Sequence, residues 1–206
     1  MSATTLDVEG LSKSFGEHSL FSGLTFRVQA GLTALQGRNG SGKTTLVKIL
    51  ASLLRPSAGT VRVRQAESEL SGDEKRLAIG WAGLDLAFYE DFSARENLIF
   101  FRRAAGHPAR PAEIDRLLAD VGLESAANQR VGAYSTGMKQ RLRLAFALLF
   151  DPPILLLDEP MAGLDADGRA IAESVIATRR RSGAVLLASN DERDFVEPEQ
   201  VIRLGR

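Results

Sequence analysis

The feature that most constrains this chain is a glycine-rich loop at residues 37–45, with the sequence Gly-Arg-Asn-Gly-Ser-Gly-Lys-Thr-Thr. An apolar run, Leu32–Gln36, precedes the loop, and apolar residues at helical spacing, Leu46, Ile49 and Leu50, follow it. The loop therefore joins a predicted strand to a predicted helix, as a Walker A loop does. In such a loop, backbone N–H groups and the positive end of the helix face a phosphate chain, so a nucleoside triphosphate is the expected ligand.

Two side chains of this loop, Lys43 and Thr44, have roles that the pattern predicts. Lys43 is expected to reach the β- and γ-phosphates, and the Thr44 hydroxyl is expected to bind Mg²⁺. The alternative is a chance glycine-rich turn before a helix, which would bind nothing. The remaining residues that we expect to cradle the phosphates are Gly37, Asn39, Gly40, Ser41, Gly42 and Thr45.

Composition limits the domain count and the partners. A chain of 206 residues can bury one sizeable core, so a single domain over residues 1–206 is expected. The 26 basic and 26 acidic residues cancel, which gives no global electrostatic reason to expect nucleic acid or anionic membrane as a partner. The absence of cysteine excludes disulfides, thiolate zinc sites and thiol catalysis. No signal sequence is recognisable and no apolar stretch is long enough to span a bilayer, so a cytoplasmic location is expected.

The N-terminal third carries the signals of a small antiparallel sheet. Thr4–Glu9 and Leu24–Val28 alternate apolar and polar residues, and Ser22-Gly23 or Ala30-Gly31 is predicted to supply a turn beside the second of them. Thr60–Arg64 and Leu77–Ala82 are predicted to be further strands. Phe15 lies between the first two strands, a short way ahead of the phosphate loop, where it could either stack on an adenine or pack under its own sheet.

Aromatic residues are concentrated between Trp81 and Phe101, and they include Phe88 and Tyr89. Such a cluster can anchor a protein partner, or its members can be shared between core and surface. Helical periodicity and loop signals predict a mostly helical subdomain over about residues 92–150.

A second candidate anion site precedes the helix predicted at Met138–Phe150, where Ser135 and Gly137 lie at the helix N-terminus. A helix N-terminus binds anions, so these two residues could recognise phosphate; the alternative is an ordinary serine N-cap.

An acidic pair follows the strand predicted at Ile154–Leu157, a continuous apolar run typical of a strand buried on both faces of a parallel sheet. Ligands bind at the carboxyl ends of such strands. Asp158 could hold Mg²⁺ through water while Glu159 polarises the attacking water, or the pair could be a simple acidic turn. A helix at Asp167–Arg181 and a strand at Ala184–Ser189 complete an α/β P-loop core.

In this order, the phosphate loop, Tyr134–Gln140, Ile154–Pro160 and Gly163–Asp165 resemble the ATP-binding cassette of ABC transporters, over essentially the whole chain. The resemblance implies a parallel core sheet, an antiparallel β subdomain and a helical insert. It also implies that Phe15 stacks on adenine, that Asp165 belongs to the dimer-contacting loop, and that Ser135 and Gly137 hold the γ-phosphate of ATP bound to the opposite subunit. On this reading, the site is completed only by dimerisation.

The sequence departs from that family's pattern at three places. Thr136 and Met138 replace a glycine and the glutamine of the usual Leu-Ser-Gly-Gly-Gln motif, which the family tolerates. Leu84 occupies the position of a magnesium-contacting glutamine, so that the metal would take a water or another ligand such as Asp85. Asn190 stands where a histidine usually senses the γ-phosphate, and would act as a neutral amide sensor.

The resemblance implies an ATPase that binds ATP with Mg²⁺ and pairs as a homodimer, or as a heterodimer with another cassette. It would drive integral membrane permease subunits from the inner face of the cell membrane, and no nucleic acid partner is expected. The small size and the Leu20–Phe26 sequence further resemble the haem-exporter ATPase of cytochrome c maturation. The alternatives are a soluble ABC ATPase acting on ribosomes or DNA, and a nucleotide-binding regulator with slow turnover.

Overall fold

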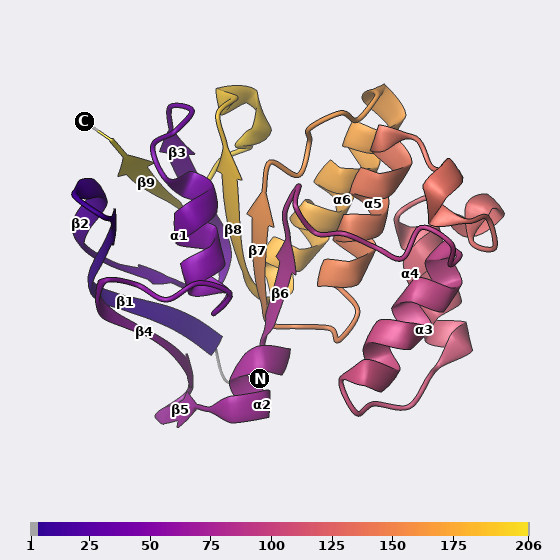
Figure 1. Ribbon diagram of the computed structural model, residues 1–206, viewed down its shortest axis with the longest axis horizontal. Helices are drawn as coiled ribbons and strands as arrows, with labels where there is room; N and C mark the ends of the chain where they lie inside the picture. The colour runs from indigo at the N-terminus through magenta and orange to yellow at the C-terminus, as the bar shows by residue number, and fades with distance from the viewer. Residues whose placement is uncertain (1–3, 206) are drawn as a thin grey trace.

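The structure is a computed structural model that describes residues 4–205, and its strands form two sheets (Figure 1). The predicted α/β cassette, with a parallel core sheet and a smaller antiparallel one, is confirmed. The predicted domain span of 1–206 includes residues 1–3 and 206, which lie outside the described residues.

The antiparallel sheet has the order β2-β1-β4-β5 and consists of β1 (Thr4–Phe15), β2 (His18–Val28), β4 (Ala58–Gln65) and β5 (Ser68–Leu70). The parallel sheet has the order β6-β7-β8-β3-β9 and consists of β3 (Gly31–Gly37), β6 (Ile79–Ala82), β7 (Ile154–Asp158), β8 (Ala184–Ser189) and β9 (Gln200–Leu204).

Helices cover both faces of the parallel sheet. Helix α1 packs against β3, β7 and β8 on the face turned to the antiparallel sheet, whereas α5 and α6 pack on the other face, and α3 and α4 lie beyond α5 (Figure 1). The helices are α1 (Lys43–Leu50), α2 (Gly72–Leu77), α3 (Ala94–Ala104), α4 (Pro111–Asp120), α5 (Thr136–Ala147) and α6 (Ala166–Ser182). Three 3₁₀ turns complete the set: η1 (Glu124–Ala126), η2 (Val131–Ala133) and η3 (Glu192–Asp194).

The sheet separates two hydrophobic cores. Because successive side chains of a strand point to opposite faces, Ile154 and Leu156 contribute to the core on the α1 side, and Leu155 and Leu157 to the core shared with α5 and α6. All four are at most 1% exposed. This double burial explains the unbroken apolar run of β7, and it holds the carboxyl end of the strand in a fixed place.

Two local predictions were wrong. Ser22-Gly23, predicted as a turn, lies inside β2, because β1 and β2 form one long hairpin that turns at residues 16–17. Leu11 pairs with Leu24 and Lys13 with Phe21, so two residues of β2 oppose one of β1, as in a β-bulge. Leu77, predicted in a strand, ends α2 instead.

The helical subdomain predicted at about residues 92–150 contains α3, α4 and α5. Helix α3 begins with a capping box, in which the Ser93 hydroxyl accepts from the Glu96 N–H and the Glu96 carboxylate accepts from the Ser93 N–H. None of the helices within residues 4–205 combines the length and apolar character needed to cross a bilayer.

Candidate active site

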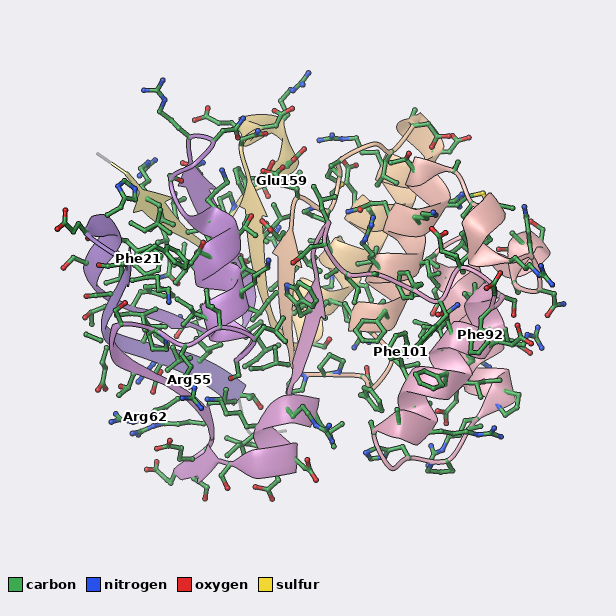
Figure 2. The ribbon with its side chains drawn as sticks, in the orientation of Figure 1. Phe21, Arg55, Arg62, Phe92, Phe101 and Glu159 are labelled. Atoms are coloured by element: carbon green, nitrogen blue, oxygen red, sulfur yellow. The ribbon has the colours of Figure 1, made fainter. Side chains whose placement is uncertain are left out.

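The carboxyl ends of the parallel strands meet at one edge of the sheet, and the predicted phosphate loop, the Asp158-Glu159 pair and Asn190 gather there. Strand β3 ends at Gly37, β7 at Asp158 and β8 at Ser189. Figure 2 shows Glu159 at this edge, above the central strands. A cavity of about 620 Å³ opens at the edge and is lined by Leu20, Asn39, Gly40, Gly42, Lys43, Thr44, Thr45, Leu84, Glu159, Met161, Ala162, Arg169, Asn190, Asp191 and Asp194.

The backbone of the loop depends on glycine at two positions. Gly40 and Gly42 have φ values of 80° and 97°, in the region that other residues rarely adopt. A Cβ at Gly42 would also lie 2.7 Å from Cγ of Leu20. Gly42 is the N-cap of α1 and supplies no side-chain hydrogen bond, so the N–H groups of the first turn are left for a ligand. Uncapped N–H groups and a helix dipole together form an anion site.

Lys43 is held at the centre of this loop. Its side chain is buried, and Nζ donates to the Gly37 carbonyl at 2.7 Å and to the Arg38 carbonyl at 3.4 Å. These two carbonyl oxygens belong to the same loop, so the ammonium group is anchored where a phosphate would lie and retains a further donor for it.

Asp158 has the properties of a cation ligand. Its carboxylate is buried, and Oδ1 has no hydrogen-bond partner among the described residues. Burial raises the pKa of Asp158, and the neighbouring Thr44 hydroxyl and Lys43 ammonium oppose that shift. A buried oxygen without a partner is costly unless it binds something, so the donor set of Thr44 and Asp158 fits Mg²⁺. When bound, Mg²⁺ would neutralise phosphate charge at this point.

Glu159 is fixed against the end of β8. Its backbone adopts φ 51°, and its N–H donates to the Ala188 carbonyl at 2.8 Å. The carboxylate oxygen Oε1 accepts from the Asn190 N–H at 3.1 Å, and Oε2 lies 3.2 Å from the Ser189 hydroxyl. Burial raises the pKa of Glu159, a shift that suits a group which accepts a proton near neutral pH.

Asn190 connects the end of β8 to the phosphate loop. Its Nδ2 donates to Oδ1 of Asn39 at 2.8 Å, although the two residues are 151 positions apart in the chain. The amide therefore lies beside the loop, where a γ-phosphate sensor is required. The role itself remains a prediction.

Ser135 and Gly137 lie outside the cavity. Ser135 is the N-cap of α5, and its hydroxyl accepts from the Met138 N–H at 3.2 Å. A Cβ on Gly137 would lie 3.3 Å from the Gly163 carbonyl oxygen, so this end of α5 packs close to the loop that precedes α6. Within one chain, the N-terminus of α5 therefore contributes no residue to the lining of the cavity beside the phosphate loop.

The structure shows the positions of Phe15, Leu84 and Asp85, three residues that the sequence analysis considered in relation to adenine or metal binding. Phe15 is 52% exposed, with Nζ of Lys13 4.6 Å from its ring centroid. Of the two alternatives, packing under its own sheet does not fit this exposure, and stacking on adenine stays a prediction. Leu84 lines the cavity at the glutamine position. Asp85, considered there as a metal ligand, instead forms an ion pair with Lys48.

The sequence analysis missed three residues around Glu159. Gln140 is buried and its Nε2 donates to the carbonyls of Glu159 and Pro160, both at 3.1 Å. Gln140 is the last residue of Tyr134–Gln140, one of the segments that resemble the ATP-binding cassette, so this motif could have identified it as a site residue. Arg169 and Asp194 line the cavity and form an ion pair with each other, but no motif or spacing distinguishes them.

The sequence is similar to ABC transporter ATP-binding proteins. A family model described as "ABC transporter" matches residues 21–162, more than half of the chain. Three curated relatives are the uncharacterised ABC transporter ATP-binding protein YxlF of Bacillus subtilis, the daunorubicin resistance ATP-binding protein DrrA3 of Streptomyces coeruleorubidus, and the Nod factor export ATP-binding protein I of Rhizobium sp. strain N33. They are 40%, 40% and 41% identical over 90%, 82% and 82% of this chain. The chain spans only 62%, 55% and 57% of their respective lengths.

The fold is similar to solved structures over nearly its whole length. A bacterial Atm1-family ABC exporter with ATP bound superposes with a TM-score of 0.84, covering 98% of this chain and 37% of that one. At 20% identity this similarity supports the fold alone.

Proposed function

The chain belongs to the ABC transporter ATP-binding family, and from this premise we propose that it is the subunit that binds and hydrolyses ATP in a membrane exporter. One observation carries the proposal: Lys43, Glu159 and Asn190 converge on one cavity, whereas Ser135, at the start of α5, does not line it. This is the arrangement expected when two copies must combine to complete each site.

The chemistry within one chain is positioning and electrostatics. Lys43 and the N–H groups of the loop bind the phosphates, and Thr44 with Asp158 would hold Mg²⁺. Glu159 orients and polarises the attacking water with a carboxylate that is already held by Asn190 N–H. Asn190 donates from a neutral amide and adds no charge.

The second copy supplies the other half of the site. In a head-to-tail dimer, Ser135 and Gly137 of one chain face the phosphates bound by the other, so that ATP lies between the subunits. Closure of this dimer drives the membrane subunits, and hydrolysis resets it. A homodimer or a pair with a second cassette satisfies the same geometry.

The membrane subunits dock on the aromatic surface around α3, which places the protein at the cytoplasmic face of the membrane. Tyr89, Phe92 and Phe100 are 49%, 39% and 38% exposed, and the ring centroids of Tyr89 and Phe100 are 4.9 Å apart. Beside them, an apolar groove of about 500 Å³ is lined in part by Trp81 and Phe101. Figure 2 shows Phe92 and Phe101 together on the α3 side of the molecule, far from Glu159.

The aromatic cluster is divided between surface and core. Phe88 packs edge-to-face with Phe101 and Phe146, each at a centroid distance of 6.2 Å, and it is partly buried against the hydrophobic core. Replacing Phe88 would therefore test stability, whereas replacing Phe92 tests docking.

The direction of transport is proposed from the relatives. Two of the three relatives named above are a daunorubicin resistance protein and a Nod factor export protein, which favours export over import. They give no support to haem export, which remains a prediction from the sequence alone.

The proposed function is tested by measuring MgATP hydrolysis against protein concentration. Because each site needs two chains, the rate per chain should rise with concentration and then level off. A rate per chain that stays constant from nanomolar to micromolar protein, or no hydrolysis at all, would contradict the proposal.

Docking is tested by copurification with a coexpressed membrane subunit of an ABC exporter. Phe92→Ala should weaken copurification and leave MgATP affinity unchanged. Val196→Ala is the matched control, because Val196 is 57% exposed and lies away from the aromatic surface. Equal recovery of parent, Phe92→Ala and Val196→Ala would exclude this docking surface.

A further inference from the structure

The Ser189 hydroxyl lies between two carboxylates, and only one of them belongs to the mechanism described above. Oγ of Ser189 is 2.5 Å from Oδ2 of Asp194 and 3.2 Å from Oε2 of Glu159, and it accepts from the Asp191 N–H at 3.0 Å. Ser189 is 1% exposed, so solvent does not compete for these contacts.

A hydroxyl group has one hydrogen, so it can donate to only one of the two carboxylates at a time. The shorter contact, to Asp194, is in the range of a charge-assisted O–H···O⁻ bond, whereas the contact to Glu159 is longer than the usual O–H···O distance. The Asp191 N–H can only donate, and it therefore occupies an acceptor lone pair of Oγ. The Ser189 hydrogen is thus directed to Asp194.

Asp194 is itself held in place by Arg169. Nη2 of Arg169 contacts Oδ1 of Asp194 at 2.5 Å, and the Asp194 side chain is only 5% exposed. Arg169 comes from α6 and Asp194 from the η3 turn, so this pair ties the helix to the segment that follows β8. Since a guanidinium group only donates hydrogen bonds, Oδ1 of Asp194 is occupied and Oδ2 is presented to Ser189.

On the basis of the proposed ATPase function, we propose that Asp194, held by Arg169, is a positioning residue that draws the Ser189 hydroxyl away from Glu159. Oε1 of Glu159 already accepts from the Asn190 N–H. With the Ser189 hydrogen turned to Asp194, Oε2 is left as an acceptor for the attacking water. Asp194 touches no reacting atom and acts only through Ser189.

The proposal predicts what happens when Asp194 becomes an amide. In Asp194→Asn, the amide oxygen stays on the Arg169 side, since Arg169 has only donors, and the amide NH₂ faces Ser189. The Ser189 hydroxyl must then accept from that NH₂ group, and its hydrogen turns to Oε2 of Glu159, where it competes with water.

The experiment compares steady-state MgATP hydrolysis in the full chain for the parent, Asp194→Asn and Asp194→Asn/Ser189→Ala. We expect Asp194→Asn to lower kcat about tenfold, a part of the roughly 10²–10⁴-fold contribution of a general base, while KM and the melting temperature change little. Removing the competing hydroxyl in the double variant should restore most of kcat. Glu173→Gln is the matched control, because it removes the other ion pair of Arg169 and leaves Asp194 untouched.

Recovery of kcat in the double variant separates positioning from a merely structural role, since a second buried substitution does not repair a damaged fold. The proposal is overturned if Asp194→Asn hydrolyses ATP at the parent rate, or if Ser189→Ala fails to reverse its defect. If Asp194→Asn does not fold, Asp194→Ala with and without Ser189→Ala gives a second pair with the same expected reversal, because a methyl group accepts no hydrogen bond and leaves Oε2 of Glu159 as the acceptor for the Ser189 hydrogen. A parent chain without turnover would instead overturn the proposed function, and this inference with it.

Discussion

Two helix N-termini in this molecule have the chemistry of an anion site, and they differ in how their N–H groups are satisfied. Helix α1 follows Gly42, which offers no side chain, and its first turn opens into the cavity with Lys43 beside it. Helix α5 follows Ser135, whose hydroxyl accepts from the Met138 N–H and so caps the helix from within the chain.

This difference in capping suggests a different role for each helix N-terminus in the proposed ATP site. An uncapped end surrounded by a buried lysine and a buried carboxylate is assembled to receive phosphate in a single chain. A self-capped, exposed end such as that of α5 already has a partner for one of its N–H groups, so it does not need a ligand within its own chain. We therefore propose an intrachain role for the α1 end and an intersubunit role for the α5 end.

The largest expected effect comes from removing the lysine at the α1 end. Lys43→Ala should weaken MgATP binding about 100-fold, because a charge-assisted contact to phosphate contributes about 3 kcal/mol. Isothermal titration calorimetry measures this directly. Lys48→Ala is the control, since Lys48 lies on the same helix but pairs with Asp85. Equal loss in both variants would show that general charge, and not the loop, sets the affinity.

A smaller effect is expected at Asn190, which joins β8 to the α1 end. Asn190→Ala should slow hydrolysis about tenfold, because one hydrogen-bond donor to developing charge is removed and no full charge was present there. Asn190→His should raise turnover and introduce a pH-dependent step near pH 6.5, where histidine titrates. An unchanged hydrolysis rate in Asn190→Ala would show that Asn190 does not sense the γ-phosphate.

The smallest effect distinguishes the α5 end from an ordinary capped helix. Ser135→Ala and Ser93→Ala each remove an N-cap, so each should cost about 1 kcal/mol of unfolding free energy. Only Ser135→Ala should also reduce ATP-dependent dimerisation and hydrolysis, by several-fold, with MgATP affinity of the single chain unchanged. Chemical denaturation and light scattering measure the two effects. Identical behaviour of the two variants would mean that Ser135 is a cap and nothing more.

Some regions of the molecule could be predicted from the sequence, and others could not. The phosphate loop and the Asp158-Glu159 pair were predictable because each depends on local chain geometry and on the shared edge of parallel strands. The bulge at Ser22-Gly23 was not, because a turn-like pair inside a strand is decided by its pairing with β1. The Arg169–Asp194 pair was also unpredictable, because it depends on how α6 packs against the segment after β8.

Phe88 and Phe92 show the same limit within one stretch of sequence. Both are aromatic and only four residues apart, yet Phe88 packs against Phe101 and Phe146 while Phe92 is 39% exposed. Composition identifies the cluster, but only packing decides which of its members face solvent.

In the proposed dimer, the α1 end of one chain and the α5 end of another form one ATP site. Glu159→Gln tests it most directly, because it retains the shape of the side chain while removing the carboxylate that polarises water, so bound ATP should persist. Light scattering of this variant should show a monomer without nucleotide and a long-lived dimer with MgATP, and a second substitution, Ser135→Ala, should shorten the lifetime of that dimer. A monomer in the presence of saturating MgATP, or a dimer that is indifferent to Ser135, would contradict the account.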